Sequence, residues 1–361
     1  MKKFFVLLTM LAIPPMLAVA ATAKKLPLEK LKLPPGFSIS VYAEIPEARS
    51  MTQTPDGRIF VGTRSGDKVH MIQNGKVQVF AQGLSVPNGV AYKDGKLYVA
   101  EISRILEFNV PDKITEPQKP VRVLPQTFPS DEHHGWKFIR FGPDRKLYVP
   151  VGANCNICDP GTEYARIYRI DVNGTSKELV AQGVRNTVGF DWDPVSKDFW
   201  FTDNGRDMLG DDVPPDELNH LTQLGQNFGF PYCHGKNIKD PEFGTKDCAQ
   251  FTPPVVELRA HVASLGMRFY TGNMFPKEFH NNIILAEHGS WNRTIPQGYR
   301  LTFVELKNNQ PVKVTGFIEG WLQGDQAWGR PVDVEVLKDG SMLVSDDKAG
   351  VIYRITYKGK Q

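Results

Sequence analysis

The hydrophobic and polar positions of this chain repeat one short pattern six times. In each copy an apolar strand leads into a turn of Pro, Asp, Gly or Asn, and a second strand rich in Val, Ile, Leu, Phe and Tyr follows. Such a pattern is typical of a β-hairpin. The regular copies are TPDGRIFVG (54–62), YKDGKLYVA (92–100), FGPDRKLYVPVG (141–152) and LKDGSMLVSDD (337–347), and the looser ones are DPVSKDFWFTDNG (193–205) and FPKEFHNNIILAEHG (275–289).

The spacing of these hairpins indicates the fold. Their turns lie near residues 56, 94, 144, 197, 281 and 339. Strand-rich repeats of roughly 40–50 residues are typical of β-propellers. A β-sandwich also has many short strands, but it would not repeat one turn motif at near-constant spacing. We therefore predict an all-β, six-bladed β-propeller, with five or seven blades as the alternatives because the loose copies are harder to count.

Two single strands are left over at the ends, FSISVYAE (37–44) and VIYRITY (351–357). Pairing them in one blade would close the ring, so we expect one propeller domain over residues 24–361. The longest step between hairpins predicts an insertion near 207–260.

Residues 1–23 have the order of a secretory signal. Two lysines precede an apolar stretch, and small residues in A-x-A order follow it. An uncleaved anchor helix is the alternative, but the stretch is short for a membrane span and contains Pro14–Pro15. No later segment has transmembrane length. The expected mature protein is periplasmic or secreted, without a membrane span.

Composition and charge limit the kinds of partner that the protein can bind. The chain has 361 residues, 41% of them hydrophobic and 23% charged, which is ordinary for a globular protein. Its formal charge of +3 includes Lys2 and Lys3, so the predicted mature domain is nearly neutral. No basic block argues for a nucleic acid or an anionic lipid surface.

The chain has four cysteines, which in an exported protein favours disulfides. We favour the sequence-local pairing, Cys155–Cys158 and Cys233–Cys248. The C-x-x-C spacing also suits zinc, but no second close pair is available.

Polar residues gather at only one end of the predicted hairpins. An antiparallel hairpin begins and ends on the same side, so the residues before its first strand and after its second share one face. The other ends carry turn residues only. The shared face includes Asn88, His133, His134, Arg185, Asn186, Asp203, His261, His288, Arg330 and Asp333.

These residue types suit acid–base chemistry beside an anion. A histidine such as His133 or His134 on a rigid loop is a natural general base for an alcohol proton. Arg185 offers a planar fork for a carboxylate or a carbonyl, and Asn186 can donate and accept beside it.

Hard oxygen groups follow in FTDNGRD and GDDVPPDELN. Gly205 allows its backbone to turn carbonyls toward a cation, and the acidic side chains nearby include Asp207 and Asp216. This set favours calcium over a transition metal. The chain has no nucleophile elbow, phosphate loop or G-x-G-x-x-G turn.

The succession HHGWKFIRFGPDRKLYV, GVRNTVGFDWDP, DNGRD…DELN, LGQNFGFPYCHG, AHVASLGMRFYTGNMFP, EHGSWNR and GRPVDV resembles the soluble PQQ-dependent sugar dehydrogenases, closest to their aldose and L-sorbosone dehydrogenase-like branch. The resemblance covers residues 34–357. It implies a six-bladed propeller that holds pyrroloquinoline quinone (PQQ) and calcium over its axis.

The resemblance assigns roles residue by residue. His134 matches the catalytic base, and Arg185 and Asn186 match the pair that touches the quinone. The matched calcium ligands are the carbonyls of Gly205 and Arg206, followed by the acidic pair Asp216 and Glu217. The remaining cofactor-binding residues that we expect are Asn88, His133, Arg293, Arg330 and Asp333.

The implied reaction is oxidation of an aldose, a sugar aldehyde or a related alcohol. His134 would remove the hydroxyl proton while hydride passes to the quinone, and an external electron acceptor would reoxidise the cofactor. The alternatives are a calcium-dependent propeller lactonase or hydrolase, and a propeller that binds a sugar without turning it over.

Overall fold

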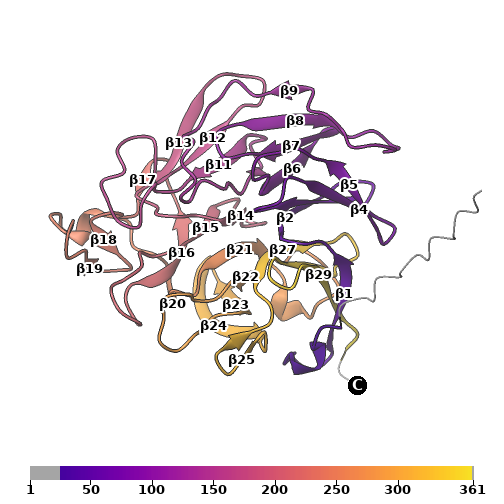
Figure 1. Ribbon diagram of the computed structural model, residues 1–361. Helices are drawn as coiled ribbons and strands as arrows, with labels where there is room; N and C mark the ends of the chain where they lie inside the picture. Colours follow the sequence, from indigo (N-terminus) through magenta and orange to yellow (C-terminus); the bar gives the residue numbers. More distant parts are fainter. Residues whose placement is uncertain (1–24, 360–361) are drawn as a thin grey trace, which may run out of the picture.

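The computed structural model describes residues 25–359 and shows an all-β protein. Six sheets are arranged as blades around one axis, so the predicted six-bladed β-propeller is confirmed (Figure 1). The helices among the described residues are three short 3-10 turns, η1 (Leu28–Lys30), η2 (Cys248–Gln250) and η3 (Lys277–Phe279). None of the helices in this part of the chain is long and apolar enough to cross a membrane. The signal peptide predicted for residues 1–23 lies outside the described residues.

Each predicted hairpin forms the two innermost strands of one blade, with the innermost strands in contact around the axis. The first three blades, from the axis outward, are β2 (Ala48–Gln53), β3 (Ile59–Thr63), β4 (Val69–Gln73) and β5 (Lys76–Ala81); β6 (Gly89–Lys93), β7 (Lys96–Ala100), β8 (Ile105–Asn109) and β9 (Arg122–Val123); and β10 (Arg140–Phe141), β11 (Leu147–Val151), β12 (Arg166–Ile170) and β13 (Lys177–Gln182), to which β17 (Gln226–Asn227) adds in parallel.

The other three blades follow the same order. They are β14 (Gly189–Trp192), β15 (Phe199–Asp203), β16 (Pro215–Leu221) and β20 (Val256–Ala260); β21 (Ser264–Phe269), β22 (Ile283–Glu287), β23 (Arg300–Lys307) and β24 (Gln310–Ile318); and β27 (Pro331–Val336), β28 (Met342–Asp346), β29 (Val351–Tyr357) and β1 (Phe37–Glu44). Two small sheets pair β18 (Cys233–His234) with β19 (Ile238–Lys239) and β25 (Leu322–Gln323) with β26 (Gln326–Ala327).

The terminal strands close the ring, as predicted. β1 pairs antiparallel with β29, in a register that runs from Phe37 opposite Tyr357 to Glu44 opposite Val351 (Figure 1). The sixth blade therefore takes its outermost strand from the start of the domain. Closure in this way pairs the beginning of the domain with its end and leaves no open gap in the ring.

Both favoured disulfides are present, Cys155–Cys158 and Cys233–Cys248. The second lies in the long stretch between the fourth and fifth hairpins. This stretch contributes β16 and β20 to the fourth blade, and between them it holds β17, β18, β19 and η2.

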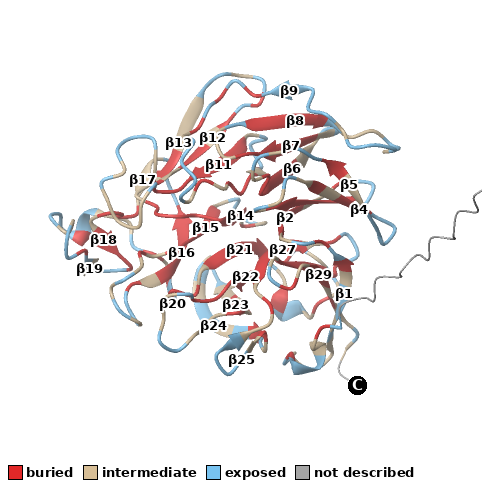
Figure 2. Ribbon diagram, viewed as in Figure 1, coloured by how far each residue is buried: buried red, intermediate tan, exposed pale blue. Residues whose placement is uncertain are grey.

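The hydrophobic core lies between neighbouring blades. Phe60 and Phe80 of the first blade, for example, pack with Val90 and Leu97 of the second. Figure 2 shows the same distribution, with buried strands inside and exposed loops at the rim. Burying each such side chain stabilises the fold by about 1.5–3 kcal/mol. The packed blades thus hold the loops at the ends of the axis in place.

Candidate active site

A cavity of about 230 Å³ lies where the hairpins begin and end. Its walls come from strand ends and loops of the first, fourth and fifth blades and from the segments that lead into β10, β14 and β27. The lining residues are Arg49, Arg64, His134, Trp136, Arg185, Asn186, Asn204, Gly205, Asp207, Asp216, His261, Ala263, Leu265, His288, Trp291, Asn292 and Arg330.

Half of the residues predicted for the site line this cavity. They are His134, Arg185, Asn186, Gly205, Asp216 and Arg330. His134 and Arg185 therefore lie on the same side of the molecule, as the hairpin geometry predicts.

Three of the other predicted residues are buried behind the cavity. Asn88 accepts a hydrogen bond from Arg49 Nε at 2.9 Å and so braces a residue that does line it. Asp333 accepts from the Met51 backbone N–H at 2.9 Å. Glu217 accepts from the Gly235 N–H at 2.8 Å. The side chains of these three residues thus form hydrogen bonds within the protein.

The remaining three predicted residues also miss the lining. His133 is exposed, with its ring 4.0 Å from that of His134. Arg293 binds Asp212 at 3.0 Å. Arg206 turns away to Asp240, at 2.6 Å from Nη1 to the carboxylate.

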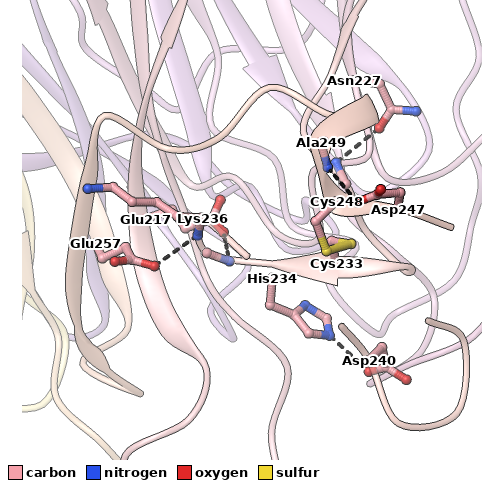
Figure 3. Close-up of a disulfide and its surroundings, with 12 residues drawn as sticks. Glu217, Asn227, Cys233, His234, Lys236, Asp240, Asp247, Cys248, Ala249 and Glu257 are labelled. Atoms are coloured by element: carbon pink, nitrogen blue, oxygen red, sulfur yellow. Dashed lines mark hydrogen bonds and ion pairs between the residues drawn. A yellow bond between two sulfur atoms is a disulfide. The ribbon is translucent and has the colours of Figure 1, made fainter. Parts of the chain in front are cut away.

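Asp240, the partner of Arg206, lies near the second disulfide, as Figure 3 shows. There His234 binds Asp240 at 2.8 Å, next to the Cys233–Cys248 bond. Asp240 thus joins a histidine and an arginine, and its pKa is lowered to about 2 by those hydrogen bonds against the opposing effect of burial. This region is a structural ion network beside the cavity.

His134 has the geometry of a general base. Its Nδ1 lies 2.8 Å from the carbonyl oxygen of Ala153. Because a carbonyl only accepts, Nδ1 carries the hydrogen and Nε2 keeps a free lone pair. Burial, and after it the charge of Arg185, lower the His134 pKa to about 2, so the ring is neutral near pH 7.

His134 has an unusual backbone conformation and packs closely against a glycine. His134 has φ of 52°, a left-handed conformation that is unusual for a histidine. Gly152 lies against it, and a Cβ on Gly152 would come within 2.6 Å of His134 Cβ. The glycine after β11 therefore makes room for His134.

Arg185 is held at five points. Its Nε and Nη2 donate to the backbone and side-chain oxygens of Asn156 at 2.8 and 2.9 Å. Nη2 also binds Asp207 at 3.1 Å, and Nη1 donates to the carbonyls of Asn204 and Gly205 at 3.2 and 2.8 Å. The Arg185 side chain is 4% exposed, and its hydrogen bonds leave the guanidinium little freedom.

Two other arginines bring positive charge without a carboxylate partner. Arg330 donates to the carbonyls of His288 and Gly289 at 3.0 and 2.6 Å. Arg64 lies over the Trp136 ring, 4.0 Å from its centre, and takes part in none of the ion pairs seen among residues 25–359. Burial lowers the pKa of both groups, which therefore favour an anion in the cavity.

Several polar atoms in the lining have no partner inside the described chain. They are Trp136 Nε1, His261 Nδ1 and Asn292 Oδ1. Buried polar groups are normally satisfied, so these atoms offer hydrogen bonds to a molecule or water in the cavity.

The four residues predicted for calcium do not form a cage of free ligands. Asp216 accepts from the N–H groups of Gly205 and Ser264, at 3.0 and 2.9 Å. Burial raises the Asp216 pKa to about 7. The Gly205 carbonyl already accepts from Arg185. Within residues 25–359 no group of three or more His, Cys, Asp or Glu side chains could hold a metal.

Sequence reasoning missed Trp136 and left Arg64 without a role. Trp136 stands two residues after His134 in the same HHGWK segment, so the alternation of that segment could have shown it. Arg64 follows the first hairpin by one residue, at its open end. Arg64 stacks on Trp136 across two segments that are far apart in the chain, and neither segment alone predicts this contact.

Comparison with known proteins identifies the family of this chain. A sequence model described as TrAA12-like matches residues 162–358, more than half of the chain. The chain belongs to the TrAA12-like family. A relative from Borreliella burgdorferi of undescribed function is 38% identical over 347 residues and covers 91% of each chain.

Solved structures share the fold of this TrAA12-like protein. The PQQ domain of pyranose dehydrogenase from Coprinopsis cinerea has a TM-score of 0.74 and is 18% identical, covering 90% of this chain and 97% of its own. A calcium structure of the carbohydrate-active family AA12 enzyme from Trichoderma reesei has a TM-score of 0.76 and is 19% identical, covering 91% and 97%. The resemblance inferred from the sequence motifs is confirmed at the level of family and fold.

Proposed function

We propose that this TrAA12-like protein is an oxidoreductase that oxidises an aldose, a sugar aldehyde or a related alcohol with PQQ as its cofactor. The observation that carries the proposal is the pairing of a neutral His134, with Nε2 free, and a fixed Arg185 in one cavity. The related structures from Coprinopsis cinerea and Trichoderma reesei, which are described as a PQQ domain and a carbohydrate-active enzyme, support it.

The cavity fits the chemistry of PQQ, a flat quinone that carries several carboxylates. Four arginines line the cavity, and Arg64 and Arg330 have no carboxylate partner there. Trp136, whose ring Arg64 covers, adds an unpartnered indole N–H. Guanidinium groups bind carboxylates through paired, charge-assisted hydrogen bonds.

The chain's own residues handle the proton. His134 accepts the substrate's hydroxyl proton at Nε2, while the Ala153 carbonyl keeps the hydrogen on Nδ1 and holds the ring. Arg185 presents fixed positive charge to an oxygen that becomes negative. Bound PQQ supplies a two-electron oxidant for the carbon–hydrogen bond. An external electron acceptor is the further partner of this proposal.

Of the four residues predicted to bind calcium, two line the cavity, Gly205 and Asp216. Their oxygens already accept hydrogen bonds within the protein, so these residues do not fit a dedicated calcium cage. No step of the proposed reaction depends on the ion. The two disulfides suit an oxidising compartment, so we place the protein in the periplasm or outside the cell.

The test is an absorbance titration of the purified protein with PQQ, with and without calcium, followed by addition of candidate aldoses. We expect a bound quinone spectrum that bleaches on addition of one class of sugar. A protein that binds no PQQ, or whose bound quinone no sugar or alcohol reduces, would overturn the proposal. Lactone hydrolysis without quinone would instead identify a hydrolase.

A further inference from the structure

A small disulfide ring borders the cavity. Cys155 and Cys158 close a ring of four residues in the loop between β11 and β12. Both cysteines are partly exposed, and the ring lies directly after Gly152 and Ala153 at the end of β11. The disulfide lies outside the cavity lining, and Cys155 packs against the small cluster of Ala153, Ala165 and Phe230.

The residue inside this ring binds Arg185 twice. The Asn156 backbone oxygen accepts from Arg185 Nε at 2.8 Å, and Asn156 Oδ1 accepts from Arg185 Nη2 at 2.9 Å. The same Oδ1 accepts from the Asp207 N–H at 2.8 Å, and Asn156 Nδ2 donates to the Asp207 carbonyl at 3.1 Å. Asn156 thus joins the guanidinium to the loop after β15, which supplies its other partners.

The start of the same loop contacts both Arg185 and His134. The Ala153 N–H donates to the Arg185 carbonyl at 2.8 Å, and the Ala153 carbonyl accepts from His134 Nδ1 at 2.8 Å. Between Ala153 and β12 the loop has no strand pairing. The disulfide, the packing of the loop against a small apolar cluster, and the hydrogen bonds of Asn156 itself therefore fix the backbone there together. A short covalent ring restricts the conformations of the residues that it encloses.

We propose that the Cys155–Cys158 ring, acting through Asn156, positions the Arg185 guanidinium in the cavity. Asn156 and the two cysteines are positioning residues and do not touch the reacting atoms. The inference rests on the proposed function for its effect on turnover, but the contact that it describes can be measured in the protein alone.

The test compares Cys155→Ser/Cys158→Ser, Asn156→Ala and Asn156→Asp, which keeps an acceptor oxygen. Asn154→Ala is the matched control, because Asn154 lies on the same loop, is exposed and does not bind Arg185; its one contact with the ring is a 3.8 Å approach of Oδ1 to Cys158 Sγ. The first measurement is solvent exchange of the Arg185 Nε–H by NMR in the cofactor-free protein, with its signal assigned through Arg185→Lys. We expect exchange about 10-fold faster in the double-serine and alanine variants, and near wild type in Asn156→Asp and the control.

The second measurement is PQQ-dependent dye reduction. Misplacing a fixed group by a fraction of an ångström should lower kcat about 10-fold in the same two variants with little change in KM for the sugar. A general loss of stability would not split kcat from KM, nor be restored by Asn156→Asp.

Wild-type exchange and wild-type kcat in Asn156→Ala would overturn the inference. That variant keeps the disulfide, so it tests the contact of Asn156 with Arg185 even where the double-serine protein does not fold. Wild-type exchange in a folded double-serine protein would overturn the role of the ring. If the wild type shows no PQQ-dependent activity, the proposed function fails, while the exchange measurement still confirms or refutes the contact between the ring and Arg185.

Discussion

The two ends of the propeller axis hold the same kinds of side chain in different states of pairing. At the end where the hairpins turn, Arg140 lies 3.4 Å from Asp191 and 3.1 Å from Glu335. Arg268 lies 3.1 Å from Glu335 and 3.5 Å from Asp333. The cations and carboxylates there bind one another along the innermost strands.

At the cavity end, two cations bind only carbonyl oxygens or a ring. Arg330 donates to backbone oxygens, and Arg64 lies over Trp136. A nearby histidine keeps a lone pair free. Residue type alone therefore does not mark a site in this fold. Arg64 and Arg330 are available to an anionic ligand because, among the described residues, the blades leave them without a carboxylate, whereas Arg49 and Arg185 of the same cavity are paired with Asp347 and Asp207.

The largest effect is expected at the free histidine. His134→Ala should lower kcat for dye reduction about 10²- to 10⁴-fold, since it removes the proton acceptor, with PQQ affinity nearly unchanged. Steady-state kinetics and a quinone titration check both quantities. His133→Ala is the neighbouring variant, and a larger loss of kcat there than in His134→Ala would move the base to the exposed ring.

The paired end should respond in stability alone. Arg268→Ala leaves Glu335 and Asp333 buried with less compensation, so the free energy of unfolding should fall by about 3–5 kcal/mol. PQQ affinity should stay at the wild-type value. Arg145→Ala is the control, because Arg145 and Asp94 form an exposed pair worth about 0–1 kcal/mol. A weakened PQQ affinity in Arg268→Ala would break the distinction between the two ends.

The unpaired end should respond in affinity. Arg64→Ala should raise the Kd for PQQ about 10- to 100-fold, as expected for the loss of a charge-assisted hydrogen bond. Because the Arg64 guanidinium pairs with no carboxylate of the described chain, its removal leaves no unpaired buried charge, and the unfolding midpoint should change little. Urea denaturation and fluorescence titration with PQQ test both halves of this statement, and an unaltered Kd would show that the cofactor does not reach Arg64.

The smallest effect concerns pH. Burial and the Arg185 charge lower the His134 pKa to about 2, so the basic form persists as the pH falls. We expect kcat to change less than about twofold between roughly pH 8 and pH 5, where an ordinary histidine with a pKa near 6.5 would already be protonated. An acid limb with a midpoint near 6.5 would indicate a histidine in a water-like environment.

The same shift predicts the direction of pH-dependent stability. The unfolded chain protonates this histidine below about pH 6.5, whereas the folded protein keeps it neutral. The free energy of unfolding should therefore decrease as the pH falls below that value. His134→Gln should remove part of this slope, which thermal denaturation at several pH values can measure.

Much of the fold was predictable because its information is local. Each hairpin carries its own turn residues and its own apolar strands, and the leftover strands at 37–44 and 351–357 form β1 and β29 with those bounds. Both disulfides join cysteines that are near in sequence. Hairpin geometry also predicted that His134 and Arg185 share a face, since an antiparallel pair returns to its starting side.

The amino-acid sequence is enough to predict the hairpins, the ring they form and the shared face of His134 and Arg185. The expectation that the turn ends carry turn residues only was wrong, because Arg140 and Arg268 pair with carboxylates there. Which charged groups are paired depends on tertiary contacts. Arg206 and Arg330 look alike in the chain, but one binds buried Asp240 and the other lines the cavity. The physical reason is that the pairing of a charge depends on what neighbouring blades place within about 4 Å of it, and those partners lie tens to hundreds of residues away in sequence.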